Sequence, residues 1–141
     1  MRLSAFVLTV FIITASMKSS TSGDVKVATG TVYFLRSTGW NMSTGAFPTF
    51  IDGELVCKLN NKRFSIHELT PGSHQFSVQF MGKRSKDKIE RIDINIQAGK
   101  TYYLQLIYEH GGFVDKLYLE EIMESSAKRL MEKMEEDKKC L

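Results

Sequence analysis

The sequence predicts a mainly β fold: a small antiparallel β-sandwich of about seven or eight strands, followed by a C-terminal amphipathic α-helix. Three observations support this fold class. Across residues 30–122, apolar and polar side chains alternate with a period of two, which is typical of strands with one buried face. Turn pairs that contain glycine or proline separate the alternating segments at short intervals. Across residues 123–139, the apolar spacing changes to three and four residues, which indicates a helix packed on the sandwich.

The N-terminal segment has the features of a secretory signal peptide. Arg2 precedes an apolar run over residues 3–15, which is too short to span about 30 Å of hydrocarbon comfortably. Small residues then crowd positions 15–23, where a signal peptidase can cut. We therefore expect a signal peptide over residues 1–22, a short linker over residues 23–29, and an exported protein that is periplasmic or secreted. The alternative is an uncleaved N-terminal segment that tethers the domain to the membrane.

Turn signals divide the predicted sandwich into its strands. Asp52-Gly53 tolerates positive φ and favours a tight hairpin, and Pro71-Gly72 fixes the next corner. The strand after that corner is the clearest, because its apolar side chains share one face and its serine and glutamine side chains share the other. Residues 101–109 carry apolar groups on both faces, so we expect a central strand there. The expected strands are residues 30–36, 47–51, 54–59, 62–69, 73–80, 91–97, 101–109 and 113–119.

The predicted C-terminal helix contains no glycine or proline. Its apolar stripe lies among glutamate and lysine residues, and we expect this stripe to pack on the sandwich. The alternative is that the stripe pairs with a partner helix or with a second copy of the chain. The stripe consists of Leu119, Ile122, Met123, Leu130 and Met134.

The charge balance argues against a nucleic-acid-binding protein. The formal net charge is +3, and it falls to +1 once Arg2 and Lys18 leave with the signal peptide. A near-neutral domain has no general attraction for nucleic acid or for an anionic membrane. The basic cluster within residues 83–88 is a local exception. We expect this cluster to be a solvated hairpin tip, and the alternative is a contact for an anionic polymer or a lipid head group.

The motifs of the common enzyme classes are missing from the sequence. His67, His74 and His110 lie on separate predicted strands or turns, so no pair has metal-ligand spacing. There is no G-x-S-x-G elbow, and no glycine-rich loop joins a strand to a helix. We expect His74 to be a packed or rim histidine, and the protein to have no enzymatic activity, cofactor or metal. A hydrolase would need His74 or His110 within roughly 3 Å of a carboxylate or a serine.

The two cysteines are informative by position. A bacterial lipoprotein carries its lipid on a cysteine directly after the apolar leader, but the cysteines here are Cys57 and Cys140, so we expect no lipid anchor. Outside the cytoplasm these thiols could pair. Cys140 is the penultimate residue, however, where chains usually fray. We therefore expect unpaired or intermolecularly reactive thiols, with an intramolecular disulfide as the less favoured alternative.

The candidate binding residues centre on the loop over residues 37–46. This loop carries Trp40, the only tryptophan, and Phe47 follows it directly. Exposed aromatic rings bury a large area on a sugar or a protein at low entropic cost. The sequence leaves two alternatives open: Trp40 caps one end of the core, or Trp40 and Phe47 form an exposed aromatic patch.

Four motifs stand out along the chain: VYFLR at residues 32–36, FIDGELV at 50–56, LTPGSHQFSV at 69–78, and IQAGKTYYLQL at 96–106. Taken together and in order, they resemble the bacterial exported and lipoprotein domain of unknown function number two-eight-four-six. The D-G, P-G-x-H and A-G-K-x-Y-Y elements also resemble PEGA-type domains of bacterial surface proteins. We expect the similarity to extend from about Gly30 to the C-terminal helix.

The resemblance implies a small β-sandwich module at the bacterial envelope, with no established enzymatic activity or cofactor. Arg36, His74 and Lys100 are the polar motif residues without an obvious turn role, so they join Trp40 and Phe47 as candidate binding residues. The positions that match the family motif are Tyr33, Arg36, Asp52, Gly53, Pro71, Gly72, His74, Gly99, Lys100, Tyr102 and Tyr103.

These observations lead to one expected function and one alternative. We expect an exported, non-enzymatic module that binds a protein or a glycan of the cell envelope. The alternative is a structural or assembly protein that self-associates through its C-terminal helix.

Overall fold

The structure is a computed structural model. The predicted signal peptide lies outside the residues that the structure describes, and so does most of the predicted linker. In the described part of the chain, no helix is long and apolar enough to cross a membrane. The described residues are 27–40, 44–80, 83–84, 91–113 and 115–140.

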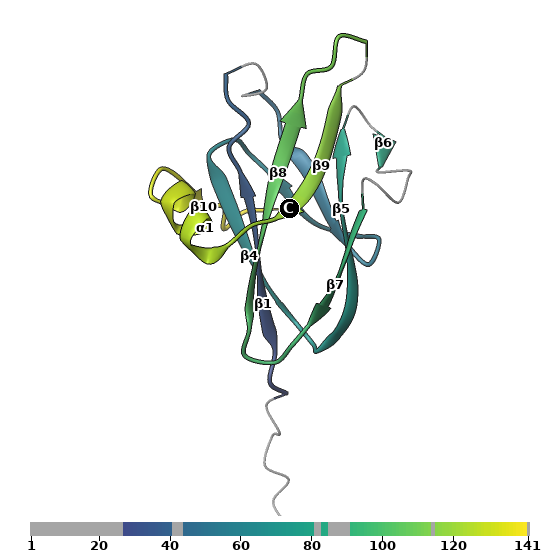
Figure 1. Cartoon of the computed structure of the whole chain (residues 1–141), viewed down its shortest axis with the longest axis vertical. Helices are drawn as coiled ribbons and strands as arrows, with labels where there is room; N and C mark the ends of the chain where they lie inside the picture. Colours follow the sequence, from purple (N-terminus) through teal and green to yellow (C-terminus); the bar gives the residue numbers. More distant parts are fainter. Residues whose placement is uncertain (1–26, 41–43, 81–82, 85–90, 114, 141) are drawn as a thin grey trace, which may run out of the picture.

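The strands form two sheets that face each other, which confirms the predicted β-sandwich (Figure 1). The first sheet has the order β10-β4-β1-β8-β9, and the second has the order β3-β2-β5-β6, with β7 also paired to β5. The first sheet consists of β1 (Gly30–Arg36), β4 (Arg63–Leu69), β8 (Thr101–Glu109), β9 (Lys116–Glu121) and β10 (Glu135–Glu136). The second consists of β2 (Phe47–Ile51), β3 (Glu54–Leu59), β5 (Gly72–Phe80), β6 (Lys83–Arg84) and β7 (Arg91–Ile96).

The main hydrophobic core lies between the two sheets, on the faces that the alternation marks as apolar. Phe76 and Val78 of β5 lie in one buried cluster with Leu104 and Leu106 of β8. The rings of Phe34 and Phe76 meet edge to face across the core, with their centroids 6.0 Å apart. Removing apolar surface from water contributes about 25 cal/mol per Å², so this layer supplies the main driving force for folding.

The pairing of β1 with β8 is parallel, which differs from the expected antiparallel sandwich. After β1 the chain visits the second sheet as β2 and β3, returns antiparallel as β4, and visits the second sheet again before β8. It can therefore re-enter the first sheet in the direction of β1. The remaining sandwich strands pair antiparallel, apart from the short β10. As a consequence, the segments that follow β1 and β8 leave the sandwich at the same end.

The single α-helix within the described residues, α1 (Glu124–Met131), packs on the outer face of the first sheet (Figure 1). Ala127 of the helix, Leu35 of β1 and Tyr103 of β8 form a second buried cluster. This cluster explains why β8 carries apolar groups on both faces. Leu104 faces the main core, whereas Tyr103 faces the helix.

The helix is shorter than the predicted range of residues 123–139, because it ends at Met131. Beyond the helix, the backbone N–H groups of Glu135 and Asp137 donate to carbonyls of β4 and of the turn before it. The chain therefore leaves the helix to form β10 at the edge of the first sheet. Met134 still packs on the same cluster as the helix does, so the helical spacing of apolar residues continues past the helix itself.

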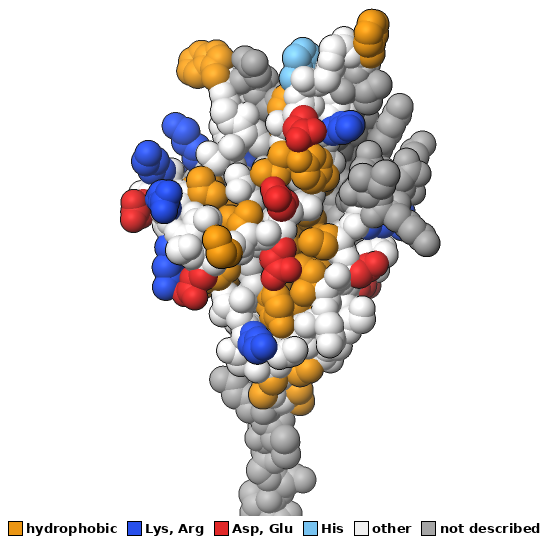
Figure 2. All heavy atoms as spheres, in the orientation of Figure 1, with side chains coloured by type: hydrophobic (Ala, Val, Ile, Leu, Met, Phe, Trp, Pro, Cys, Tyr) orange, Lys and Arg blue, Asp and Glu red, His pale blue; other side chains and the backbone are white. Residues whose placement is uncertain are grey.

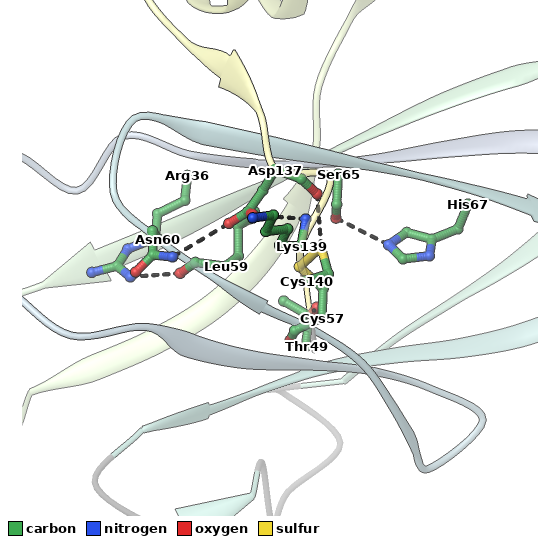
Figure 3. The surroundings of a disulfide bond; sticks show 10 residues. All are labelled: Arg36, Thr49, Cys57, Leu59, Asn60, Ser65, His67, Asp137, Lys139 and Cys140. Atoms are coloured by element: carbon green, nitrogen blue, oxygen red, sulfur yellow. Dashed lines mark hydrogen bonds between the residues drawn. A yellow bond between two sulfur atoms is a disulfide. The ribbon is translucent and has the colours of Figure 1, made fainter.

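The chain ends in a disulfide between Cys57 and Cys140, so the expectation of unpaired cysteines is wrong (Figure 3). Their Cα atoms are 4.4 Å apart. The penultimate residue is not frayed, because the N–H of Lys58 donates to the Cys140 carbonyl at 2.7 Å. Since β3 belongs to the second sheet and β10 to the first, the tail and its disulfide join the two sheets along one edge of the sandwich.

Replacing both cysteines, as Cys57→Ala with Cys140→Ser, is expected to lower the free energy of unfolding by about 4 kcal/mol. The disulfide closes a loop with a sequence separation of 83 residues, and cross-links of this span restrict the unfolded chain by about this amount. Urea unfolding of the parent and the variant measures the difference. Reductant should shift the parent to the stability of the variant and leave the variant unchanged. Equal stability of the two oxidised proteins would contradict the role of the disulfide.

Candidate binding surface

Three connecting segments gather at one end of the sandwich, which we call the loop end. The segments after β1 and after β8 emerge there because these strands are parallel neighbours in register, with Arg36 opposite Leu106 (Figure 1). The turn between β3 and β4 lies at the same end, because Arg63 pairs with Arg36. The loop end is defined by residues 37–40, 44–46, 60–62 and 110–113.

Arg36 is the buried residue that organises this end. Its side chain is fully buried at the end of β1, and its guanidinium stacks on the Phe47 ring with the central carbon 3.9 Å from the ring centroid. Nη1 donates to the carbonyls of Leu59 and Gly45, at 2.6 and 2.7 Å. Nε donates to the Thr38 hydroxyl at 3.2 Å. One side chain therefore fastens both ends of the long loop to the end of β3. Figure 3 shows its contact with Leu59.

Burial lowers the pKa of Arg36 from its usual value to about 10. The guanidinium thus stays protonated at neutral pH. Two carbonyl acceptors and an aromatic face surround the charge, which is the environment that a buried cation requires. Arg36 is accordingly a positioning residue of the loop end, and it is not itself presented to a ligand.

Asn61 ties the long loop to the β3–β4 turn. Its side-chain oxygen accepts the Thr38 N–H at 3.0 Å, and its amide nitrogen donates to the Gly39 carbonyl at 3.4 Å. Gly39 has φ of +68°, a conformation that glycine adopts without strain. Trp40 therefore follows a section of loop whose backbone is held from two sides.

The two aromatic residues that the sequence singled out have different environments. Trp40 is 91% exposed, so it does not cap the core. Phe47 is only 7% exposed, because it faces inward at the start of β2 beneath Arg36. The prediction that Phe47 belongs to an exposed aromatic patch with Trp40 is therefore wrong.

Phe113 is the exposed aromatic residue of the loop end that sequence reasoning missed. The sequence placed it in a strand over residues 113–119, but β9 begins at Lys116 and Phe113 lies in the loop before it. Its exposure of 105% is that of a residue in an open chain. Figure 2 shows hydrophobic groups standing out at two places on this end of the molecule. The Gly111-Gly112 pair was the available signal, since such a pair favours a loop over a strand.

Polar residues surround the base of the β8–β9 loop. Nδ1 of His110 lies 2.6 Å from a carboxylate oxygen of Asp115. A shallow hollow of about 430 Å³ lies beside this pair, lined by Glu109, His110, Gly111 and Lys116. This loop therefore carries a hydrophobic tip above a polar base.

His74 and Lys100 lie at the opposite end of the sandwich from Arg36. Lys100 is exposed in the turn between β7 and β8, where its carbonyl accepts the Thr31 N–H at 2.9 Å. His74 lies near the start of β5. The structure thus does not bring Arg36, His74 and Lys100 together into one site.

His74 is held by the β2–β3 turn. Its Nδ1 lies 2.6 Å from an oxygen of Asp52, and its Nε2 lies 2.9 Å from the Thr70 carbonyl. This pair, like His110 with Asp115, meets the distance criterion for a hydrolase. Both ring nitrogens of His74 face acceptor oxygens, an arrangement that favours the protonated ring. The pair ties the start of β5 to the β2–β3 turn.

The pKa values of this pair move in opposite directions. The hydrogen bond to Asp52 raises the pKa of His74; burial opposes this, and the Thr70 carbonyl supports it. Burial alone would raise the pKa of the Asp52 carboxyl. The hydrogen bonds from the Gln75 N–H and from His74 outweigh burial, so the pKa of Asp52 lies below its usual value.

The fold and this end surface define a class: small β-sandwich domains with loops clustered at one end. The family model described as "Protein of unknown function (DUF2846)" matches residues 26–117, and the chain belongs to that family. The match ends within β9, so it is shorter than the expected similarity up to the C-terminal helix. Helix α1, β10 and Cys140 lie beyond it. A search of curated proteins found no match.

The variant Asp52→Asn is expected to lose about 1 kcal/mol of stability, most of it between about pH 4.5 and 6.5. Because the pKa of His74 is raised in the folded protein, its ion pair contributes its full stabilisation below the pKa of the imidazole in the unfolded chain. This stabilisation is lost as the pH rises through the pKa of His74 in the folded protein. The lowered pKa of Asp52 stabilises it above the unfolded carboxyl pKa, and this is lost on acidification. Asp52 is 50% exposed, which keeps the effect small.

Urea unfolding at several pH values measures this difference between parent and Asp52→Asn. Asparagine keeps the acceptor for the Gln75 N–H and tolerates the positive φ of 52° at this position, so the backbone should not change. The difference in stability should narrow as the pH rises through the folded pKa of His74, which lies above its usual value. A gap that is constant from pH 5 to pH 9 would show that the ion pair does not form.

Proposed function

We propose that this chain is an exported, non-enzymatic module of the cell envelope that binds an envelope component through its loop end. One observation carries the proposal: two fully exposed aromatic side chains, Trp40 and Phe113, stand on separate loops at the same end of the sandwich. Large exposed apolar groups are unfavourable in water, and they mark interaction sites when they gather in one place.

Specific contacts of buried and polar side chains fix part of the loop end. Arg36 is buried at the cost of desolvating a charge, and its hydrogen bonds fix the loop that carries Trp40. Asn61 adds a second tie to the same loop. A loop that is held in this way presents Trp40 in a defined place, which lowers the entropic cost of binding.

The disulfide supports export. Disulfides persist in oxidising compartments outside the cytoplasm and are rare inside it. The Cys57–Cys140 bond therefore fits the predicted signal peptide over residues 1–22. A chain of this kind acts in the periplasm or outside the cell, and the alternative of an uncleaved leader would place the same domain on a membrane surface.

The alternative function, self-association through the helix, has less support. Leu130 and Met134 pack against the cluster between the helix and the first sheet, and Ile122 does so too. Leu119 lies in the main core. Only Met123 of the predicted stripe is exposed, at 75%. The apolar stripe thus covers its own sheet, which leaves little of it for a partner helix.

The variant Trp40→Ala/Phe113→Ala is expected to lose most of its retention on isolated cell envelopes, by about tenfold or more. Each exposed ring offers apolar area worth roughly 1.5 kcal/mol or more when it is buried. The measurement is the bound fraction of purified protein after sedimentation with washed envelopes. Met123→Ala is the matched control, because it removes an exposed apolar side chain away from the loop end. Equal retention of the double variant and the parent would refute the proposal.

A further inference from the structure

We infer that the loop end docks on the surface of a lipid bilayer, where Trp40 and Phe113 enter the interfacial layer. This inference rests on the proposed function and specifies the envelope component. The sequence favoured a protein or a glycan as the partner. The geometry of the two rings points instead to lipid.

The exposure of the rings is the first argument. At 91% and 105%, the side chains of Trp40 and Phe113 have both ring faces free, so no neighbour fixes their orientation. Recognition of a sugar or a protein pocket favours rings that are held in place, since each mobile side chain that is immobilised weakens binding. A lipid interface is fluid and demands no single orientation. Freely exposed rings therefore suit a bilayer better than a shaped partner.

The arrangement of the two loops is the second argument. The rings stand on loops that follow neighbouring parallel strands, so both can reach one plane at the end of the sandwich. Tryptophan prefers the boundary between lipid head groups and acyl chains. Apolar side chains that enter this layer contribute in proportion to the area they bury. Two such tips at one end of the sandwich fit a flat surface.

The third argument is the presence of basic side chains near the two exposed rings. Lys62 and Lys116 are exposed at or beside the loop end, on the β3–β4 turn and at the start of β9. Basic residues close to a membrane are attracted to anionic lipids. The loop end should therefore prefer anionic to neutral vesicles.

Trp40 is the only tryptophan of the chain, so its fluorescence reports this one side chain. The oxidised protein is mixed with vesicles of equal parts phosphatidylcholine and phosphatidylglycerol. Trp40 emission should shift to the blue, and lipids with brominated acyl chains should quench it. Phe113→Ala should weaken the vesicle affinity by about tenfold, whereas Met123→Ala should leave it unchanged. Vesicles of phosphatidylcholine alone should bind more weakly.

The absence of a blue shift and of quenching overturns the inference, even if the protein sediments with vesicles, because another segment must then bind. Sedimentation of the parent and of Trp40→Ala/Phe113→Ala with envelopes stripped of lipid separates the lipid inference from the proposed function. If retention there still depends on Trp40 and Phe113, the loop end binds a protein or a glycan, and only the lipid inference fails. If the two rings affect neither vesicles nor envelopes, the proposed function fails as well.

Discussion

The covalent contact between Cys57 and Cys140 links the last residues of the chain to the middle of β3, and the arrangement of the C-terminal region follows from it. The tail that precedes Cys140 pairs with β4 in one sheet and accepts a hydrogen bond from β3 in the other. With the tail fixed, α1 lies over Leu35 and Tyr103 on the outer face of the first sheet. The disulfide thus closes one edge of the sandwich, and the packing of α1 covers the outer face of the first sheet.

Much of the fold could be predicted, because strand periodicity is a local property of the sequence. The alternation from Ser73 to Phe80 corresponds to β5, with Phe76 and Val78 inside. Three features could not be read this way. The parallel pairing of β1 with β8 depends on long-range topology. The last residue of the helix could not be predicted, because Met134 continues the helical spacing of apolar residues beyond the end of the helix. The disulfide depends on the backbone hydrogen bond between Lys58 and Cys140. The position of Cys140 near the terminus gave no indication of this hydrogen bond.

The candidate site was predictable in part. Trp40 was identified by residue type, but its exposure depends on how the loop is tied by Arg36 and Asn61. Phe47 was assigned to the same patch because it is adjacent in sequence, although its side chain faces the core. Phe113 contributes only because β1 and β8 are parallel, so a loop more than 60 residues away emerges beside the first. Arg36 was predicted as a candidate binding residue, but its side chain is buried and holds the loop through its hydrogen bonds.

The proposed function requires that the chain mature outside the cytoplasm as a disulfide-closed sandwich. The most direct test is to trap thiols in intact expressing cells with an alkylating reagent and then take the intact mass of the protein from each cell fraction. The account predicts a species that has lost the N-terminal leader and carries no alkyl group, because Cys57 and Cys140 are bonded to each other. A full-length cytoplasmic species with both cysteines alkylated would contradict it.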